Sequence, residues 1–341
     1  MKIAIIVGAL GQDGRLLSVL LKEEGYQVIE LDIDYIHSPK NLWKEHLDIK
    51  DKNKISHFIE KVKPDEVYYL AAYHHSSEQN IDIEYGLIEK SFQINVVSYF
   101  NFLEAIRTYS PRSKIFYAAS SHIFGKPETV PQNEATKFSP KSIYSLTKYN
   151  GVKLSKYYRE NYSVFSAIGI MYNHESPIRD YKFVSRKITS GLAKIKCNQM
   201  DSILLGNLEQ KTDWGFAGDY VRAMKMILNN EKPDDYVIAS GEHHSVKEFV
   251  EKSAKVLGIE IIWEGDGVNT FGKNKENGKI IIEVKPEYYR PIEVNVLLGD
   301  SSKAKKELNW SPKISFNQLV EMMTKSDLKI VRESINSSKN N

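Results

Sequence analysis

The sequence predicts an α/β protein with a doubly wound parallel sheet and a smaller C-terminal region. Three observations support this class: an apolar run at the start leads into a glycine-rich turn, further apolar runs alternate with helical patterns, and the alternation loosens in the second half. We assign residues 1–172 to the first domain, completed by a segment near 213–240. The second region takes 173–212 and 241–335, and a polar, disordered tail is expected at 336–341.

The most specific feature of the first domain is its opening strand, turn and helix. Residues 3–7 read IAIIV, which is typical of a buried parallel strand, and an amphipathic helical pattern begins near Leu16. Glycines in the turn let the backbone approach a pyrophosphate, whose charge the helix N-terminus stabilises. The predicted Rossmann-type dinucleotide site contains Gly8, Gly11, Gln12, Asp13 and Gly14.

The second strand, residues 27–33, contains an acidic residue near its end. Asp32 lies 18 positions after the last glycine of the turn (32 − 14 = 18). A carboxylate there accepts hydrogen bonds from the adenine ribose and repels a 2′-phosphate, which favours NAD over NADP. The alternative is that Asp32 or Asp34 only caps a loop. A third strand end is predicted at 47–49, where Asp48 would meet the adenine amine.

The following segments continue the alternation of strands and helices. Strands are predicted at 66–72 and 114–120, with a helix at 100–106 between them, and the second region contains a helix near 184–193 and a strand at 203–205. Ligands of doubly wound sheets bind at the carboxyl ends of the strands. The predicted cofactor site therefore extends to Leu70, Ala71 and Ala72.

A long helical pattern after Pro140 carries Tyr144 and Lys148. Because side chains four residues apart share a helix face, the lysine ammonium can lie beside the phenol and lower its pKa. A tyrosine tuned in this way removes a proton from an alcohol, which hydride transfer to a nicotinamide requires. The spacing is common in amphipathic helices, and it gains its meaning from the dinucleotide site upstream. Both residues are also expected to touch the cofactor.

The composition fits a large globular enzyme. The 47 basic and 44 acidic residues give a net charge of +3, too small to indicate a nucleic-acid or membrane surface. The single cysteine, Cys197, excludes an internal disulfide framework and fits a reducing compartment. The first residues read as a strand and not a signal sequence, and no apolar stretch has membrane length. We therefore expect a cytoplasmic protein.

With these motifs placed, the chain resembles the extended short-chain dehydrogenases/reductases, and within them the GDP-mannose 4,6-dehydratases. The resemblance runs from the glycine turn to about residue 325. Beyond the glycine turn and the tyrosine–lysine pair, it depends on blocks that follow one another in family order. These blocks are YNHESP at 172–177, FVSRKI at 183–188, GNL at 206–208, DWGFA at 213–217, YRPIEV at 289–294 and LGD at 298–300.

The resemblance implies a three-step reaction on a nucleotide-linked sugar. Tyr144, aided by Lys148 and the Ser120 hydroxyl, removes the C4 hydroxyl proton while hydride passes from C4 to the cofactor. A base then removes the C5 proton and water leaves from C6. Finally, hydride returns from the cofactor to C6.

One departure from the family affects the second step. The family places a glutamate two residues after its catalytic threonine, and here Ser120 and His122 hold these two positions. A neutral imidazole can accept the C5 proton and an imidazolium can assist the departing hydroxyl, so we favour 4,6-dehydration. The alternatives are a C4 oxidase that stops at the 4-keto sugar, an epimerase, or a histidine that only fills the strand end.

The resemblance also implies a set of substrate contacts. Arg290 and Glu293 would meet the diphosphate and ribose of GDP, and Asn173, Arg186 and Lys187 would contact the nucleotide or sugar. A family arginine is replaced by Thr212, and the neighbouring Lys211 could act there as a point charge. For Arg186 and Lys187 the alternative is a solvated helix face.

The segment from Tyr73 to Glu89 is longer than in the family, and we expect it to reshape the sugar pocket for another hexose or a heptose through Ser76. Adjacent histidines at 74 and 75 would face opposite sides of an extended chain, so no metal site is predicted. The family also generally places arginines after the second strand to hold the 2′-phosphate of NADP, whereas this chain has Asp32 and Asp34 there. The expected partners are a GDP-linked sugar and further copies of the chain, as a dimer or tetramer, with no nucleic acid and no membrane.

Overall fold

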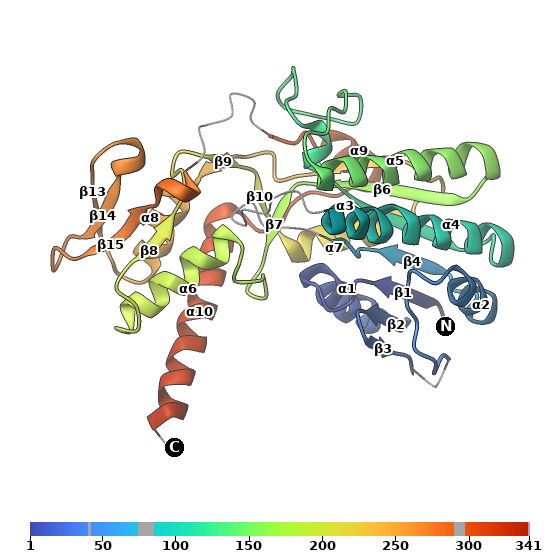
Figure 1. Cartoon of the computed structure of the whole chain (residues 1–341), viewed down its shortest axis with the longest axis horizontal. Helices are drawn as coiled ribbons and strands as arrows, with labels where there is room; N and C mark the ends of the chain where they lie inside the picture. Colours follow the sequence, from blue (N-terminus) through green and yellow to red (C-terminus); the bar gives the residue numbers. More distant parts are fainter. Residues whose placement is uncertain (40–41, 74–84, 290–296, 340–341) are drawn as a thin grey trace. The chain divides into compact units, whose positions relative to one another are not determined.

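The computed structural model describes residues 1–39, 42–73, 85–289 and 297–339 (Figure 1). The chain forms two compact units, each assembled from separate stretches. The first unit comprises Met1–Tyr172, Ala217–Gly241 and Gly299–Pro312, and the second comprises Asn173–Phe216, Glu242–Leu298 and Lys313–Asn341. After residue 172 the chain returns to the first unit twice, and these later segments complete its sheet and its helical layer.

The first unit is built on a seven-stranded sheet with the order β11-β6-β5-β4-β1-β2-β3. All neighbouring pairs are parallel except β2 and β3. The strands are β1 (Ile3–Val7), β2 (Gln27–Asp32), β3 (Tyr35–His37), β4 (Glu66–Tyr69), β5 (Lys114–Ser120), β6 (Phe165–Met171) and β11 (Asp235–Ile238). This sheet confirms the predicted doubly wound α/β class.

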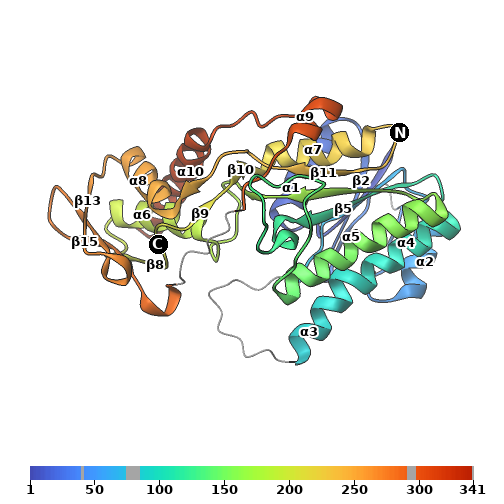
Figure 2. The same ribbon diagram turned by 90° about the horizontal axis from the view of Figure 1, so that it is seen from above.

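Helices cover both faces of this sheet, as Figure 2 shows. On one face, α1 (Gln12–Glu23) packs against α7 (Ala217–Asn229), and on the other face α4 (Ser98–Tyr109) packs against both α2 (Lys52–Val62) and α5 (Ile143–Tyr162). Apart from the edge strand β3, the strands are largely buried from both sides, which explains why most of their residues are apolar. The short helices α3 (Tyr85–Phe92) and α9 (Ser302–Leu308) complete the unit.

The strand predicted at 47–49 is wrong. After β2 the chain folds back through a turn in which Asp34 has φ +52°, and the antiparallel strand β3 takes the edge position instead. Residues 42–51 form no helix or strand and have apolar anchors: Trp43 packs edge-on against Phe58 at 4.9 Å between ring centroids, and Leu47 is buried. These contacts bury the apolar residues that suggested a strand.

The helix α5 begins where the sequence after Pro140 predicts it. Ser142 caps the helix, with its hydroxyl accepting from Ser145 N while the Ser145 hydroxyl accepts from Ser142 N, which is a capping box. The helix ends at Ser163, which adopts a left-handed conformation. This cap fixes Tyr144 in the first turn of the helix and Lys148 one turn later.

The second unit contains three packed helices and a small sheet. The helices are α6 (Val184–Lys196), α8 (Val246–Val256) and α10 (Phe316–Lys339). The sheet has the order β13 (Ile261–Glu264), β14 (Phe271–Asn274), β15 (Ile280–Val284) and β8 (Ile203–Leu205). Two short pairs join β7 (Asn173–Glu175) to β10 (Trp214–Phe216) and β9 (Lys211–Thr212) to β12 (His244–Ser245). The unit's own core includes Trp214, Phe249 and Phe316.

The C-terminal segment differs from the predicted tail. Helix α10 continues to Lys339, although disorder was expected from residue 336. The polar residues at the end of α10 extend a helix whose earlier turns pack against α6 and α8. Adding residues to an existing helix does not require a new nucleation step. In the described ranges no helix is both long and apolar enough to cross a membrane.

Candidate active site

A cradle of backbone atoms lies where β1 meets α1. Gly8 has φ +93°, and a Cβ added to it would lie 2.7 Å from Ala71 N. A Cβ on Gly14 would lie 2.4 Å from the Gly8 carbonyl oxygen. Both positions therefore require glycine. Helix α1 begins after Gly11, which has no side chain to cap it, and a helix N-terminus of this kind stabilises a bound anion.

Asp32, the last residue of β2, forms hydrogen bonds that hold this cradle. Its Oδ2 accepts a hydrogen bond from Leu10 N at 2.7 Å, and its Oδ1 accepts one from Ile33 N at 2.8 Å. Each carboxylate oxygen carries two lone pairs, so both can accept further hydrogen bonds. Holding the turn and accepting from a ribose are therefore compatible roles for the same carboxylate.

The other predicted cofactor residues lie around the same strand ends, with one exception. Leu70 follows β4 directly and donates its N–H to the Val7 carbonyl at 2.9 Å, so Ala71 and Ala72 continue along the cradle. In the first turn of α1, Gln12 Nε2 donates to Asp13 Oδ1 at 3.3 Å. The carboxylate of Asp48 instead accepts from the backbone N–H of Lys50 at 3.0 Å in the turn before α2, and its adenine contact stays a prediction.

Lys148 is buried between α5 and β5 with only 2% of its surface exposed. Its ammonium donates to the Ala118 carbonyl at 2.7 Å and lies 5.9 Å from the ring centroid of Tyr144. Burial lowers the pKa of Lys148 to about 8, while the negative charge of Asp13 acts in the opposite direction. The ammonium is therefore mostly protonated at neutral pH, where it favours the phenolate of Tyr144.

Ser120 is the last residue of β5, and His122 lies two residues beyond it. The Ser120 hydroxyl accepts from His122 N at 3.3 Å, because the chain enters a short 3₁₀ turn over Ser121–Phe124. The imidazole of His122 packs edge-on to Tyr144, with 6.3 Å between the ring centroids. Unlike the buried Ser120, His122 is exposed. The structure thus brings together the four residues predicted to be catalytic.

The sequence reasoning missed Asn95, which is fully buried in one turn of π-helix, Gln93–Val97. Its carboxamide donates to the Thr147 hydroxyl at 2.9 Å, and its Oδ1 accepts from Tyr73 N at 2.7 Å. Asn95 therefore ties the end of the described segment at Tyr73 to the catalytic helix α5, between Tyr144 and Lys148. Insertions of this type are frequent at functional sites, and the only signal in the sequence is an asparagine within an apolar helical pattern.

Three of the predicted substrate residues lie on the surface of the second unit. Asn173 is in β7, Lys211 is exposed in β9, and Lys187 on α6 places its ammonium 4.7 Å from the ring centroid of Tyr288. A second ammonium, that of Lys285, lies 5.2 Å from the same ring. The two ammonium groups make the surroundings of the Tyr288 ring positively charged, which suits a ligand that has both an aromatic group and a negative charge.

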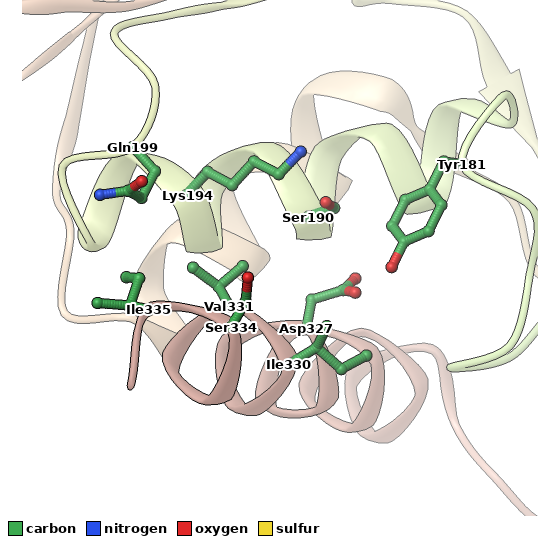
Figure 3. Close-up of a pocket in the computed structure, with 9 residues that line it drawn as sticks. All are labelled: Tyr181, Ser190, Lys194, Gln199, Asp327, Ile330, Val331, Ser334 and Ile335. Carbon is green, nitrogen blue, oxygen red and sulfur yellow. The ribbon is translucent and has the colours of Figure 1, made fainter. Parts of the chain in front are cut away.

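Arg186 has a different role from the predicted substrate contact. Its guanidinium is buried and donates to both carboxylate oxygens of Asp327 on α10 at 2.8 Å, to the Arg179 carbonyl at 2.9 Å and to the Tyr181 hydroxyl at 3.1 Å. Figure 3 shows Asp327 pointing toward α6 beside a cavity of about 250 Å³. Donors on all three nitrogens are engaged inside the unit, so Arg186 joins α6 to α10 and is not proposed as a ligand residue. The other predicted contacts, Ser76, Arg290 and Glu293, lie outside the described residues.

Comparison with known proteins identifies similar sequences along nearly the whole chain. The family model described as GDP-mannose 4,6 dehydratase matches residues 5–323. A GDP-mannose 4,6 dehydratase of Drosophila melanogaster is 40% identical over 350 residues, covering 97% of this chain and 87% of that protein. The Homo sapiens protein of the same name is 39% identical, with 98% and 93% covered, and that of Vibrio cholerae is 37% identical, with 96% and 94% covered.

Solved structures with much lower identity share the fold. RMD from Pseudomonas aeruginosa complexed with NADPH gives a TM-score of 0.78 at 16% identity, covering 97% of this chain and all of that chain. A dTDP-glucose 4,6-dehydratase from Bacillus anthracis in complex with NAD gives 0.75 at 18% identity, covering 96% and 97%. These structures support the Rossmann-type architecture described above.

Proposed function

The chain belongs to the GDP-mannose 4,6 dehydratase family, and from that premise we propose that it carries out the 4,6-dehydration of a GDP-linked sugar of the mannose type, a hexose or heptose. The family consists of nucleotide-sugar-modifying short-chain dehydrogenases/reductases, so the protein is an enzyme of this class. The observation that carries the proposal is that the His122 imidazole lies 6.3 Å from the Tyr144 ring and the Lys148 ammonium lies 5.9 Å from the centroid of the same ring.

The proposed roles follow from the chemistry of each side chain. Tyr144, as phenolate beside the Lys148 ammonium, accepts the C4 hydroxyl proton, and the Ser120 hydroxyl donates a hydrogen bond to the C4 oxygen. The resulting ketone acidifies the C5–H bond, so neutral His122 can accept that proton and return it to the departing C6 hydroxyl. A bound nicotinamide supplies the hydride acceptor at C4 and the hydride donor at C6. The balance is loss of one water with no net change in the cofactor.

A dinucleotide fits the residues of the first unit. Gly8 and Gly14 let the backbone segments of the cradle approach one another more closely than a Cβ would allow, and the N-terminus of α1 follows them. We propose that Gly8, Gly11, Gln12, Asp13 and Gly14 hold the pyrophosphate, with Asp32 at the adenine ribose. Because the Asp32 carboxylate would repel a 2′-phosphate, we propose NAD as the cofactor and not NADP.

This choice of cofactor predicts the effect of Asp32→Asn. The amide keeps an oxygen acceptor for Leu10 N but removes the negative charge, so the preference for NADH over NADPH should fall by about tenfold or more. Quenching of protein fluorescence by each reduced cofactor measures both dissociation constants. The matched control is Asp34→Asn, an 88% exposed side chain two residues later, which should leave the preference unchanged. Equal binding of the two cofactors by the native protein would contradict the proposal.

The dehydration step predicts the effect of His122→Gln. Glutamine can neither accept the C5 proton nor protonate the leaving hydroxyl, so dehydration should slow by roughly 10²–10⁴-fold while C4 oxidation continues. With GDP-mannose and NAD, the variant should accumulate a 4-keto sugar and reduced cofactor, whereas native protein should give a product lighter by one water. Mass spectrometry and absorbance of the reduced nicotinamide distinguish the two.

Two further variants sharpen this test. His122→Glu should restore dehydration, because a carboxylate can serve the same step, and His37→Gln, an exposed histidine on β3, should change neither step. Native protein that removes two hydrogens from the sugar, retains the water and leaves one reduced cofactor per product is an oxidase, and that result would remove the dehydratase proposal.

For the substrate, we propose that the second unit binds the nucleotide. Lys187, Lys211 and Asn173 lie on its surface, and Tyr288 between two lysines offers a ring on which a base could stack. Lys211 would act as a point charge on the diphosphate. Ser76, Arg290 and Glu293 are proposed contacts by family resemblance.

We also propose that the protein forms a homo-oligomer. Helices α4 and α5 pack side by side and expose apolar side chains to solvent, among them Phe100, Leu146 and Tyr157, each at least 36% exposed. Several exposed large apolar side chains on neighbouring helices are consistent with an interface. Light scattering on the purified protein measures its mass, and a monomer at micromolar concentration would contradict the proposal.

A further inference from the structure

Gly151 stands in the interior of α5, three residues after Lys148. Glycine destabilises a helix interior by about 0.5–1 kcal/mol relative to alanine, so its presence in a 20-residue helix calls for a reason. A Cβ built on Gly151 would lie 2.1 Å from both the Cζ and the hydroxyl oxygen of Tyr117. The glycine therefore provides the space that the phenol of Tyr117 occupies.

Tyr117 belongs to β5, three residues before Ser120, and it is completely buried. The ammonium of Lys148 lies over its ring, 5.1 Å from the centroid. The ring also packs against Tyr99 at 4.3 Å and against Tyr69 at 6.3 Å between centroids. These neighbours hold the ring of Tyr117 in place, so the ammonium of Lys148, which lies beside Tyr144, contacts a fixed ring face.

We propose that Tyr117 is a positioning residue for this reaction, whose ring face holds the protonated ammonium of Lys148 in place, and that Gly151 exists to admit that ring. This inference rests on the proposed function, in which Lys148 must stay charged beside Tyr144. No covalent role is assigned to Tyr117.

The charges around Lys148 explain why the ring of Tyr117 is important for its ammonium. Among the described residues, Asp13 on α1 is the one carboxylate that raises the pKa of Lys148, and burial opposes it. These buried phenols stay neutral, because burial raises the pKa of Tyr99 to about 12 and raises those of Tyr117 and Tyr69 well above their ordinary value. Two groups of β5 therefore stabilise the ammonium of Lys148: the Ala118 carbonyl and the ring face of Tyr117.

The test keeps the shape of the Tyr117 ring and changes the negative charge density on its face. Tyr117→Phe retains the negative ring face, whereas 3,5-difluorophenylalanine at the same position has nearly the same size and a weaker face. NMR titration of protein labelled at the lysine Cε atoms, with Lys148 assigned by its loss in Lys148→Met, reports the Lys148 pKa without any substrate. We expect the phenylalanine variant to stay close to native and the difluorinated one to fall by about half a pH unit or more.

Activity then tests the positioning role. In single-turnover reduction of NAD by GDP-mannose, the falling alkaline limb of the rate profile should move to lower pH by the same amount as the NMR pKa. Gly151→Ala should move both in the same direction, because the methyl group displaces Tyr117. Difluorophenylalanine in place of Phe102, which packs on Tyr69 in the same cluster, is the control and should move neither.

An unchanged Lys148 pKa in the difluorinated variant, or an equal change in the Phe102 control, would overturn the inference. So would a changed pKa with an unchanged rate profile. Absence of turnover in the native protein would count against the proposed function alone, and the NMR titration would still decide whether the ring holds the ammonium.

Discussion

Replacing Lys148 with methionine should almost abolish C4 oxidation and at the same time stabilise the protein at neutral pH. Without the ammonium, the phenol of Tyr144 returns toward its ordinary acidity in a partly buried setting, and we expect the rate to fall by roughly 10²–10⁴-fold. Methionine matches the length and apolar character of the lysine stem, so the packing between α5 and β5 should be kept. Single-turnover reduction of NAD measures the loss.

The gain in stability follows from the burial of the charge. Burial lowers the pKa of Lys148 from 10.5 to about 8, and each pKa unit corresponds to about 1.4 kcal/mol, so keeping this lysine protonated in the native state costs roughly 3 kcal/mol at pH 7. The substitution also removes the hydrogen bond to the Ala118 carbonyl, which contributes about 1 kcal/mol. The expected net increase in the free energy of unfolding at pH 7 is roughly 2 kcal/mol.

The sign of the pH dependence makes this prediction specific. Between the native pKa near 8 and the unfolded value of 10.5, the unfolded chain binds more protons than the native protein, so the native protein becomes more stable as pH rises through this window. The advantage of Lys148→Met should therefore be largest at pH 7 and shrink by pH 10. Urea unfolding at both pH values measures it. Lys153→Met, an exposed lysine on the same helix, should change stability by less than about 0.5 kcal/mol at either pH. An advantage that grows with pH would contradict the argument.

The parts of the site that the sequence predicts are those in which neighbours in sequence are neighbours in space. The glycine turn, the strand ends and the Tyr144–Lys148 pair depend on local periodicity, because a strand, a tight turn and a helix each have a sequence signature. The same reasoning failed at residues 47–49, where buried apolar residues were read as a strand. Leu47 is buried without a strand, and Trp43 is buried by packing on a helix, so burial alone does not distinguish these cases from a strand.

The residues that were missed or given the wrong role are those whose partners lie far along the chain. Asn95, which was missed, bonds to Thr147, 52 positions later, and Arg186, which was assigned to the substrate, bonds to Asp327, 141 positions later. Neither partner has a local signature, because a threonine in a helix and an aspartate in a polar C-terminal helix are both ordinary. The fit of Tyr117 against Gly151 is of the same kind: a glycine in a helix indicates a close approach but does not identify what approaches. Family resemblance did not help with Arg186, since the motif placed the residue correctly and its side chain points into the unit.

The Arg186–Asp327 pair predicts the largest loss of stability. Asp327→Asn leaves the Arg186 guanidinium buried without a counter-charge, and breaking a buried ion pair on one side costs about 3–5 kcal/mol. The variant also weakens the hydrogen bond that Asp327 accepts from the Thr189 hydroxyl at 2.6 Å. Because these contacts join α6 to α10, the second unit should unfold first. Fluorescence of its buried Trp214 should show a urea midpoint lower by about 1–2 M.

Two controls separate loss of the pair from general damage to α10. Glu321→Gln breaks an exposed ion pair with Lys325 on the same helix and should change the free energy of unfolding by less than about 1 kcal/mol. The double variant Arg186→Met with Asp327→Leu removes both charges, and the cavity beside Asp327 can accept the larger side chain. It should recover most of the loss, because buried ion pairs can often be replaced by apolar residues without loss of stability. If the double variant is as unstable as Asp327→Asn, the loss comes from packing or from the Arg179 and Tyr181 bonds, and the uncompensated charge is not its cause.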